Sequence, residues 1–422
     1  MMSEVDRRLG ELMVDDLISA MESAVIALKN NPLRDVILFH HNDTDGLSSG
    51  TILQNVFEQI GYKTNRLSLE KPYPQVLERI LNKKEQVVIF ADFAGKIGPL
   101  ISKINNGKNL VIILDHHPAE NINDKTVFNL DGELFGLKGD RDISASATSY
   151  LFADRLLHRY GLSGESDSHL GVLGAIGDGF LVNGALSGVN RDILMIAVKQ
   201  GLIRVDQSES GEDYYIKLGG VEYPSGRICS ILDTVGGVGY YSDGPSKGIK
   251  ICQLGVDSET DLYIEDLNRK KEMIFSKEIE RLRKNLQTTE NIQWFNVEDR
   301  FQPMGVKMIG VFCTLIKDLG FLDENKYLAG FQNVPDEVPG FGKIKFNATK
   351  ISMRVSNKLT DRIRAGEIPG LNSFLPEATE NLGGFSDACH GLSAATTVEI
   401  GQEALLIEEI EKVLKKGWKN NE

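Results

Sequence analysis

Short, purely apolar runs alternate with longer amphipathic segments over the first half of the chain. The runs 36–39, 87–90 and 110–114 contain no polar residue, which is typical of strands buried on both faces of a parallel sheet. Between and around them, apolar residues recur at helical spacing in four segments: 3–30, 52–60, 149–160 and 169–177. This alternation predicts that the first 200 residues or so form one α/β domain built on a parallel sheet.

The second half has a different pattern. Residues 206–226 are polar and glycine-rich, which predicts an excursion or hairpin. Residues 262–288 are charged with helical periodicity, so they form either a linker helix or a surface helix of the first domain. Later apolar runs are short and separated by turns, which indicates a smaller α+β domain. The predicted division is 1–30 for an N-terminal helix, 31–260 for the α/β domain, 261–295 for the linker helix and 296–422 for the α+β domain.

Composition excludes several classes of protein. The 422 residues include 47 lysines and arginines against 60 aspartates and glutamates, a net charge of −13, which argues against non-specific coating of nucleic acid or anionic membranes. The 4 cysteines are scattered and form no CxxC pair, so neither a disulfide scaffold nor a cysteine-based zinc site is expected. No apolar run approaches a membrane span, and the charged N-terminus lacks a signal-peptide core. We expect a cytoplasmic protein.

Each of the three apolar runs is followed by potential metal ligands. Because the carboxyl ends of parallel strands meet at one edge of a sheet, these side chains should lie together. Several carboxylates held together repel one another unless cations neutralise them, and oxygen ligands with imidazoles suit Mn²⁺ or Mg²⁺. In order along the chain, these residues are His41, Asp43 and Asp45, then Asp92, then Asp115, His116 and His117.

Each of these pieces also has an ordinary structural interpretation. Asp43-x-Asp45-Gly46 by itself is typical of a turn before a helix. A calcium-binding loop is excluded, because its twelfth position holds Ile52 instead of glutamate. Asp92 alone would be a strand-end cap, and the adjacent histidines alone would be a packed surface pair. The three pieces together, in this order, favour a metal site.

Four segments resemble the motifs of the DHH phosphoesterase superfamily: HNDTDG at 41–46, ADF at 91–93, LDHHP at 114–118 and GAIGDG at 174–179. The group that they resemble most is the RecJ-type single-strand nucleases, especially the archaeal RecJ-like proteins. The resemblance is strong over residues 35–180. Asp178 also stands out in the sequence itself, because it lies between Gly177 and Gly179, where the chain can turn sharply.

The resemblance implies two divalent ions, with Mn²⁺ preferred and Mg²⁺ as the other candidate. It implies that Asp92 bridges the ions, that His117 contacts the scissile phosphate and that Asp115 orients His116 from behind. Many RecJ proteins have aspartate at the position of His41. The implied ligands are His41, Asp43 and Asp92 for one ion, and Asp45, Asp92, His116 and Asp178 for the other.

Candidate substrate contacts lie in both halves. Ser146 belongs to a run of small hydroxyl residues before a predicted helix, which suits either a phosphate or an ordinary helix cap. Arg141 nearby is either a charge clamp or a surface arginine. Residues 388–397 resemble the GGHxxAAGxT signature of the DHHA1 substrate-binding domain, in which His390 matches the histidine. Arg354 resembles the arginine of that domain's SxR strand, which implies a grip on a nucleotide phosphate.

The function that the motifs indicate is metal-dependent stepwise hydrolysis of single-stranded nucleic acid, in DNA repair or replication. The motifs are compatible with DNA or RNA and with either polarity. One alternative is a phosphodiesterase for short oligonucleotides or for products of cyclic dinucleotides. Another is a replisome scaffold bound to the GINS complex and the replicative helicase, because archaeal RecJ-like proteins are associated with both and a eukaryotic relative has lost catalysis. The complete ligand set favours an enzyme.

Overall fold

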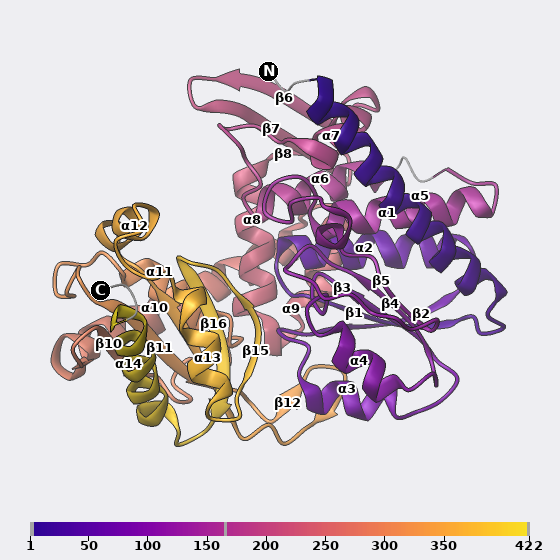
Figure 1. The fold of residues 1–422 in the computed structure, drawn as a ribbon. Coiled ribbons are helices and arrows are strands. Elements are labelled where there is room, and N and C mark those ends of the chain that lie inside the picture. The colour runs from indigo at the N-terminus through magenta and orange to yellow at the C-terminus, as the bar shows by residue number, and fades with distance from the viewer. Residues whose placement is uncertain (1–3, 164–166, 420–422) are drawn as a thin grey trace. The chain divides into compact units, whose positions relative to one another are not determined.

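The structure is a computed structural model that describes residues 4–163 and 167–419. The chain divides into two compact units, shown as a ribbon in Figure 1. The first unit comprises Met1–Gly236, Asp243–Ile264 and Pro339–Phe341, and the second comprises Gly237–Ser242, Glu265–Val338 and Gly342–Glu422.

The first unit is built on a five-stranded parallel sheet in the order β2-β1-β3-β4-β5. Every residue of β3 and β4 is buried, as expected for strands without polar residues. The last residues of β1, β3 and β4 are paired in register: His40 with Ala91, and Ala91 with Leu114. The residues that follow these strands therefore start side by side at the same edge of the sheet. The strands are β1 (Asp35–His40), β2 (Lys63–Ser68), β3 (Val87–Ala91), β4 (Leu110–Leu114) and β5 (Val127–Asn129).

Helices cover both faces of this sheet, which explains the burial of its central strands. In Figure 1, α3 and α4 lie on one face, and α1, α2 and α5 lie on the other. The predicted α/β domain with a parallel sheet is therefore confirmed. Its helices are α1 (Glu4–Asn30), α2 (Thr44–Gln59), α3 (Pro74–Leu81), α4 (Gly98–Asn105), η1 (Gly132–Phe135), α5 (Ala145–Arg159), α6 (Ser168–Gly177), α7 (Gly188–Lys199), α8 (Ser225–Asp233) and α9 (Gly244–Leu254).

The polar segment predicted over 206–226 forms an antiparallel sheet of β6 (Ile203–Ser208), β7 (Gly211–Leu218) and β8 (Val221–Pro224). Gly219 and Gly220 join β7 to β8 with φ values of +56° and +85°, a left-handed backbone that favours glycine. The chain then enters α8, which is followed by a π-helical turn, Thr234–Val238, and a 3₁₀ turn, Tyr240–Ser242.

The second unit contains a six-stranded mixed sheet in the order β15-β16-β14-β11-β10-β9, in which β10 and β11 pair in parallel and the other strand pairs that the structure describes are antiparallel. Aromatic and aliphatic residues such as Trp294, Phe331 and Phe374 form its core. The strands are β9 (Gln287–Thr288), β10 (Ile292–Asn296), β11 (Tyr327–Asn333), β14 (Ala348–Arg354), β15 (Phe385–Cys389) and β16 (Ser393–Glu399), with a small hairpin of β12 (Glu337–Val338) and β13 (Gly342–Lys343).

The helix expected over 261–295 is shorter than expected. Helix α10 spans Ser258–Asn285, and the residues after it form β9 and β10 instead. The reason is packing: Ile292 and Trp294 are buried in the core of the second unit, a non-local contact that the charged residues before them do not signal. The other helices of this unit are α11 (Met308–Ile316), α12 (Asn357–Arg364), η5 (Leu371–Ser373), α13 (Leu375–Glu380) and α14 (Glu403–Lys419).

Among residues 4–163 and 167–419, no helix is both long and apolar enough to cross a membrane.

Candidate metal centre

The first group of expected ligands follows β1. Asp43 caps α2: its Oδ1 accepts a hydrogen bond from the Gly46 N–H at 3.1 Å. Its Oδ2 lies 2.8 Å from His41 Nδ1. A Cβ on Gly46 would lie 2.5 Å from the His41 backbone, so the loop can fold back this tightly only with glycine there. The turn before the helix therefore exists and also brings Asp43 against His41.

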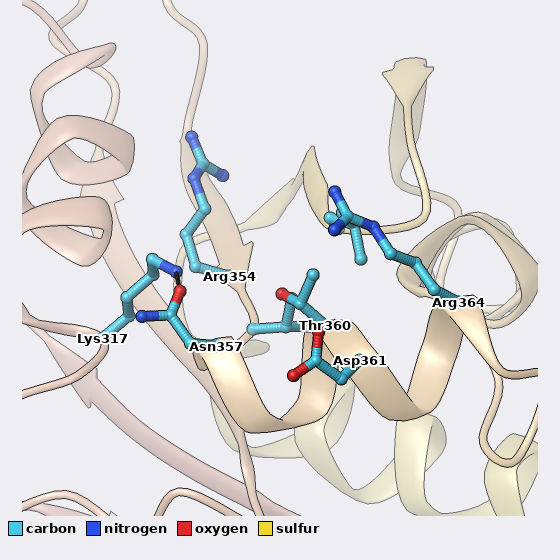
Figure 2. A pocket seen from close by; sticks show the side chains of 8 residues that line it. Lys317, Arg354, Asn357, Thr360, Asp361 and Arg364 are labelled. Carbon is cyan, nitrogen blue, oxygen red and sulfur yellow. Dashed lines mark hydrogen bonds between the residues drawn. The ribbon is translucent and has the colours of Figure 1, made fainter.

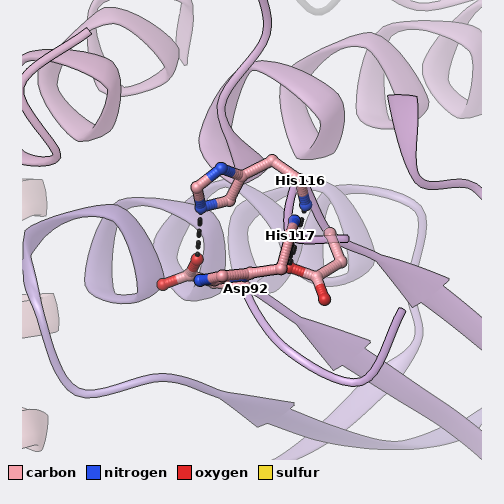
Figure 3. Close-up of side chains that lie close together, drawn as sticks. Asp92, His116 and His117 are labelled. Carbon is pink, nitrogen blue, oxygen red and sulfur yellow. Dashed lines mark hydrogen bonds and ion pairs between the residues drawn. The ribbon is translucent and has the colours of Figure 1, made fainter. Parts of the chain in front are cut away.

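Asp92 follows β3 in a left-handed conformation, with φ at +69°. This region is uncommon outside glycine but is more accessible to aspartate and asparagine than to most residues. The side chain is 1% exposed, and neither carboxylate oxygen has a hydrogen-bond partner among the described residues. Its Oδ2 lies 3.4 Å from His41 Nδ1. Its Oδ1 lies 3.4 Å from His116 Nε2 (Figure 3). Asp92 thus lies between two imidazoles.

His116 is held by a backbone carbonyl. Its Nδ1 lies 2.5 Å from the Gly139 oxygen; a carbonyl only accepts, so Nδ1 carries the hydrogen and donates it. Its Nε2 then faces three carboxylates, 3.4 Å from Asp92, 3.3 Å from Asp178 and 3.9 Å from Asp45. A Cβ on Gly139 would lie 1.6 Å from the His116 carbonyl oxygen, so only glycine permits this approach.

Asp115 corrects one expectation. Its Oδ1 accepts hydrogen bonds from the His117 ring Nδ1 and from the His116 backbone N–H, both at 2.8 Å, and its Oδ2 accepts from Gly95 N–H at 2.8 Å. Asp115 therefore orients the ring of His117, whereas the ring of His116 is oriented by Gly139. Burial alone would raise the pKa of Asp115, but its attraction to His117 and these hydrogen bonds hold the pKa below its usual range.

Asp45 is fully buried against the N-terminus of α5. Its Oδ2 accepts a hydrogen bond from the Ala145 N–H and its Oδ1 from the Ser146 N–H, both at 2.9 Å. The first turn of a helix is a favourable place for a carboxylate, because its N–H groups lack partners within the helix. Helix α6 also comes close here: a Cβ on Gly174 would lie 2.0 Å from Asp45 Oδ1. Two helices thus fix this carboxylate.

Ser146 therefore does not have the role expected for it. Its side chain is 0% exposed, its Oγ donates to the Gly171 carbonyl at 2.9 Å, and its N–H is bound to Asp45. The helix N-terminus that was expected to bind a phosphate binds a carboxylate of the protein instead. Ser146 positions Asp45 and cannot offer its hydroxyl to a substrate.

Arg141 lies on the surface close to this centre in the chain. Its Nε and Nη2 donate to the two carboxylate oxygens of Asp142 at 2.7 and 3.0 Å, and its side chain is 53% exposed. It follows Gly139, the partner of His116, by two residues. The observed pairing is that of a surface arginine, one of the two interpretations that the sequence left open.

The structure brings all the expected ligands together in overlapping groups. Within each group, one ligand atom per residue lies within 4.8 Å of the others. The first two groups have the composition that the sequence motifs implied for two ions, and Asp92 is common to all three. The groups are His41, Asp43 and Asp92; Asp45, Asp92, His116 and Asp178; and Asp92, Asp115, His116 and His117.

The electrostatics of the centre call for cations. Burial first, and then repulsion from Asp92 and Asp178, raises the pKa of Asp45 well above its usual value. Burial and Asp43 likewise raise the pKa of Asp92. Burial would lower the pKa of His116, but its contacts with Asp178 and Asp92 raise it well above its usual value. The charged form of these crowded, buried carboxylates is thus disfavoured, and bound divalent ions would offset that cost.

The donor set fits such ions. The two oxygens of Asp92 and Nε2 of His116 are buried and have no hydrogen-bond partner among the described residues, and an unsatisfied buried carboxylate is costly unless an ion or water completes it. Carboxylate oxygens with one or two imidazoles suit Mn²⁺ and Mg²⁺. The residues present therefore fit the metals that the sequence motifs implied.

Two sets of long-range hydrogen bonds hold the loop between β1 and α2, and the sequence did not predict them. The backbone N–H and the hydroxyl of Thr44, between two expected ligands, both donate to Asp233 Oδ1 at 3.1 Å. The side-chain amide of Asn42 donates to the Gly236 carbonyl at 3.0 Å. Both partners lie about 190 residues further along the chain, at the end of α8 and in the π-helical turn after it. No local sequence pattern signals these contacts.

The two expected substrate contacts of the second unit lie outside the metal groups. Arg354 ends β14 and lines a cavity of the second unit (Figure 2). Its guanidinium donates from Nε to Thr314 Oγ1 at 2.9 Å and from Nη1 to Ser352 Oγ at 3.2 Å and the Met353 carbonyl at 2.8 Å. His390 is exposed in the turn between β15 and β16.

Comparison with known proteins gives a family match to the residues that carry most of this centre, all but Asp178. Residues 35–163 match the model of the DHH family, N-terminal domain. An uncharacterized protein of Methanocaldococcus jannaschii is 32% identical over 172 residues, which cover 39% of this chain and 37% of that protein. The curated relative is thus matched over little more than a third of its length.

Two solved structures have a similar fold. RecJ from Thermus thermophilus in complex with Mn²⁺ has a TM-score of 0.61 at 12% identity, covering 94% of this chain and 55% of that one. CDC45 from Entamoeba histolytica has a TM-score of 0.53 at 10% identity, covering 96% of this chain and 99% of that one. At these identities the similarity concerns the fold.

Proposed function

We propose that this chain is a metal-dependent phosphoesterase that hydrolyses single-stranded nucleic acid stepwise from one end, as a RecJ-like exonuclease in DNA repair or replication. The match of residues 35–163 to the model of the DHH family N-terminal domain supports the proposal. The observation that carries the proposal is the buried carboxylate of Asp92, which lies 3.4 Å from both His41 and His116 and has no hydrogen-bond partner among the residues described. A bridging metal ligand has these properties.

Two ions are proposed, Mn²⁺ by preference and Mg²⁺ as the second choice. When bound, they supply Lewis-acid polarisation of the phosphate and a water activated at neutral pH. The residues that would hold them are His41, Asp43 and Asp92 for one ion, and Asp45, Asp92, His116 and Asp178 for the other.

His117 is the residue proposed to contact the scissile phosphate. Its Nδ1 is occupied by Asp115, so its Nε2 is the atom left for a phosphate oxygen. Burial lowers the pKa of His117, but the attraction of Asp115 outweighs it and raises the pKa above its usual value. When Nε2 is protonated, it can donate a hydrogen bond to an anion.

Titration with Mn²⁺ should give two binding sites per chain, measured by calorimetry after treatment with a chelator. Because the ions bind only the folded carboxylate cluster, they should also raise the melting temperature. Each site contributes about 2.7 kcal/mol when free Mn²⁺ is 100 times Kd. A folded protein that binds no Mn²⁺ and melts at the same temperature with and without it would contradict the assignment.

The activity itself is tested with end-labelled oligonucleotides. Single- and double-stranded DNA and RNA are incubated with Mn²⁺, each labelled at the 5′ or the 3′ end, and the products are resolved by length. We expect a ladder from single strands labelled at the end opposite to attack, and mononucleotides from those labelled at the attacked end. Stable single strands of both chemistries, with metal bound, would rule the proposal out.

Substrate contacts outside the metal groups are proposed for Arg354, His390 and Arg141. The Nη2 of Arg354 makes no hydrogen bond within the described part of the chain, so it is available to a phosphate. His390 is exposed, and Arg141 would have to exchange Asp142 for a substrate phosphate. The alternative is a shorter substrate, such as an oligonucleotide or a product of cyclic dinucleotides. The same digestion tests it when the rates of hydrolysis of short and long strands are compared.

A scaffold role in a replisome, with GINS and the replicative helicase as partners, is a second candidate. The fold similarity to CDC45, which covers 96% of this chain, supports it. The complete ligand groups support activity, and the two roles are compatible in one protein. Binding to purified GINS by the Asp92→Asn variant, whose metal centre would be incomplete, would separate a scaffold function from hydrolysis.

A further inference from the structure

A buried histidine directly precedes the first group of proposed ligands. His40 ends β1 and is 0% exposed. Its Nδ1 lies 2.6 Å from the carbonyl oxygen of His41, and its Nε2 lies 3.0 Å from Arg66 Nη1. A ring buried to this extent needs a partner for each nitrogen, and these two contacts supply them within the first unit.

The two contacts also fix the tautomer of this ring. A guanidinium has only donors, so Nε2 of His40 accepts from Arg66 and carries no hydrogen. A carbonyl oxygen only accepts, so Nδ1 carries the hydrogen and donates it to His41. His40 is therefore a neutral imidazole, and Arg66 determines which of its nitrogens is the donor.

Helix α2 holds this pair from the other side. Arg66 Nε donates to Gln54 Oε1 at 2.9 Å, and Gln54 Nε2 donates to Glu58 Oε1 at 2.8 Å, so the amide is oriented with its oxygen toward the guanidinium. A Cβ on Gly50, one turn before Gln54, would lie 2.8 Å from His40 Cγ. A side chain at position 50 would thus displace the ring. Helix α2 therefore sets the positions of both the guanidinium and the imidazole.

The carbonyl that His40 binds belongs to a proposed ligand. His41 offers Nδ1, which lies 2.8 Å from Asp43 Oδ2 and 3.4 Å from Asp92 Oδ2. Because Nδ1 is the ring nitrogen nearer to the main chain, its position depends on where the backbone of His41 is held. The backbone N–H of His41 donates to Ala91, the residue before Asp92, at 3.2 Å. With its carbonyl bound to His40, His41 has both of its backbone polar groups fixed.

We propose that the pair of His40 and Arg66 positions His41 as a metal ligand, through the hydrogen bond from His40 Nδ1 to the His41 carbonyl. This role rests on the proposed function, because it concerns the first of the two proposed ions. The ligands that only the second ion would use are held by α5, by Gly139 and at the end of α6. The pair should therefore affect one site and leave the other unchanged. Loss of a partner that orients a metal ligand typically costs roughly 10–100-fold in affinity.

The first test removes the donor at position 40 and measures Mn²⁺ affinity by calorimetry, after treatment with a chelator. His40→Leu has no donor for the His41 carbonyl, whereas His40→Asn places an amide N–H close to the position of the Nδ1–H. His40→Leu should weaken one Mn²⁺ site at least about tenfold and leave the other within about twofold, and His40→Asn should keep both within about threefold of the wild type. Equal losses in the two variants would overturn the role of the hydrogen bond.

Two ligand variants identify the site that responds. Asp178→Asn leaves the ligands of the first ion in place, and Asp43→Asn leaves those of the second and can still cap α2. In the Asp178→Asn background, His40→Leu should weaken the remaining site at least about tenfold, and in the Asp43→Asn background by less than about twofold. Equal losses in both backgrounds would mean that His40 only stabilises the fold. That result, or no loss in either background, would overturn the inference.

Replacement of Arg66 tests the tautomer without changing His40, and it applies even if His40→Leu does not fold. In Arg66→Met, Nε2 of His40 loses its donor, so the ring can carry its hydrogen on either nitrogen and bonds to His41 only part of the time. The same Mn²⁺ site should weaken roughly three- to tenfold. Arg34→Met is the matched control, because Arg34 precedes β1 at the opposite end of the strand and donates to backbone carbonyls there. Equal affinities of Arg66→Met and Arg34→Met would overturn the role of Arg66.

Failure here is distinct from failure of the proposed function. Two Mn²⁺ sites and hydrolysis of single strands, with no response to His40→Leu, would overturn this inference alone. A response of one site without hydrolysis of any strand would support the positioning and overturn the proposed activity alone. A folded wild type without Mn²⁺ sites would overturn the metal assignment from which both follow.

Discussion

Replacing Asp92 by asparagine is expected to reduce hydrolysis by a factor of at least about 10³, because the side chain is common to every ligand group and its charge would hold both of the proposed ions. Asparagine is chosen because it fits the space and tolerates the left-handed backbone at φ +69°, where alanine adds strain. Without metal, the variant should be at least as stable as the wild type, because a buried and repelled carboxylate has been removed. Rates are measured with saturating Mn²⁺, and stability by thermal melting in a chelator.

A second carboxylate of the first unit serves as the control. Asp167 bonds to the Asn55 amide, and burial raises its pKa to about 6, but it belongs to none of the ligand groups. Asp167→Asn should therefore retain activity and both Mn²⁺ sites. If the hydrolysis rates of Asp92→Asn and Asp167→Asn were both within tenfold of the wild-type rate, Asp92 would not be a bridging metal ligand.

The ligand groups were predictable because two signals coincide in the sequence. Apolar runs identify β1, β3 and β4, and the residues directly after these runs are carboxylates and imidazoles. Parallel pairing then places strand ends at one level, as the register of His40, Ala91 and Leu114 demonstrates. Asp92 needed no long-range information, since it is adjacent to a strand whose burial is evident from five consecutive apolar residues.

The role of Ser146 was not predictable in the same way. A run of small hydroxyl residues before a helix provides free N–H groups, and the sequence does not state which anion they receive. In the fold, the anion is Asp45, a residue 101 positions earlier. The N-terminus of α5 thus holds a proposed metal ligand, and which anion it receives depends on how α2 packs against α5.

The partner of Asp115 depends on side-chain direction. Three consecutive residues allow the carboxylate to reach either imidazole, and the motif alone favours neither. The carbonyl oxygen of Gly139 accepts the hydrogen bond from His116 Nδ1. The carboxylate of Asp115 therefore accepts from the ring of His117. Gly139 lies in a segment without periodicity, so the contact that decides the question has no local signal.

Replacing Gly174 by alanine is expected to disable the part of the centre that contains Asp45. Three glycines of α6, at 171, 174 and 177, let the helix approach its neighbours, and a Cβ at 174 would lie 2.0 Å from Asp45 Oδ1 and 2.2 Å from Ser146 Oγ. Both side chains are fully buried, so the carboxylate must shift and weaken its bonds to α5. Displacing a catalytic group by about 1 Å can cost roughly 10² in rate. We expect that loss, together with one Mn²⁺ site in place of two.

The matched variant is Gly171→Ala, one turn earlier on the same helix. Its Cβ would meet Tyr150 Cβ at 3.2 Å and Ile193 Cγ2 at 3.4 Å, and neither residue belongs to a ligand group. Overpacking costs typically 1–3 kcal/mol, so both variants should melt at lower temperature. Only Gly174→Ala should lose a metal site, because only its new methyl group opposes a ligand. If both variants lost activity in proportion to stability and both kept two Mn²⁺ sites, the position of Asp45 would not limit the reaction, and the second ion would have to be held without it.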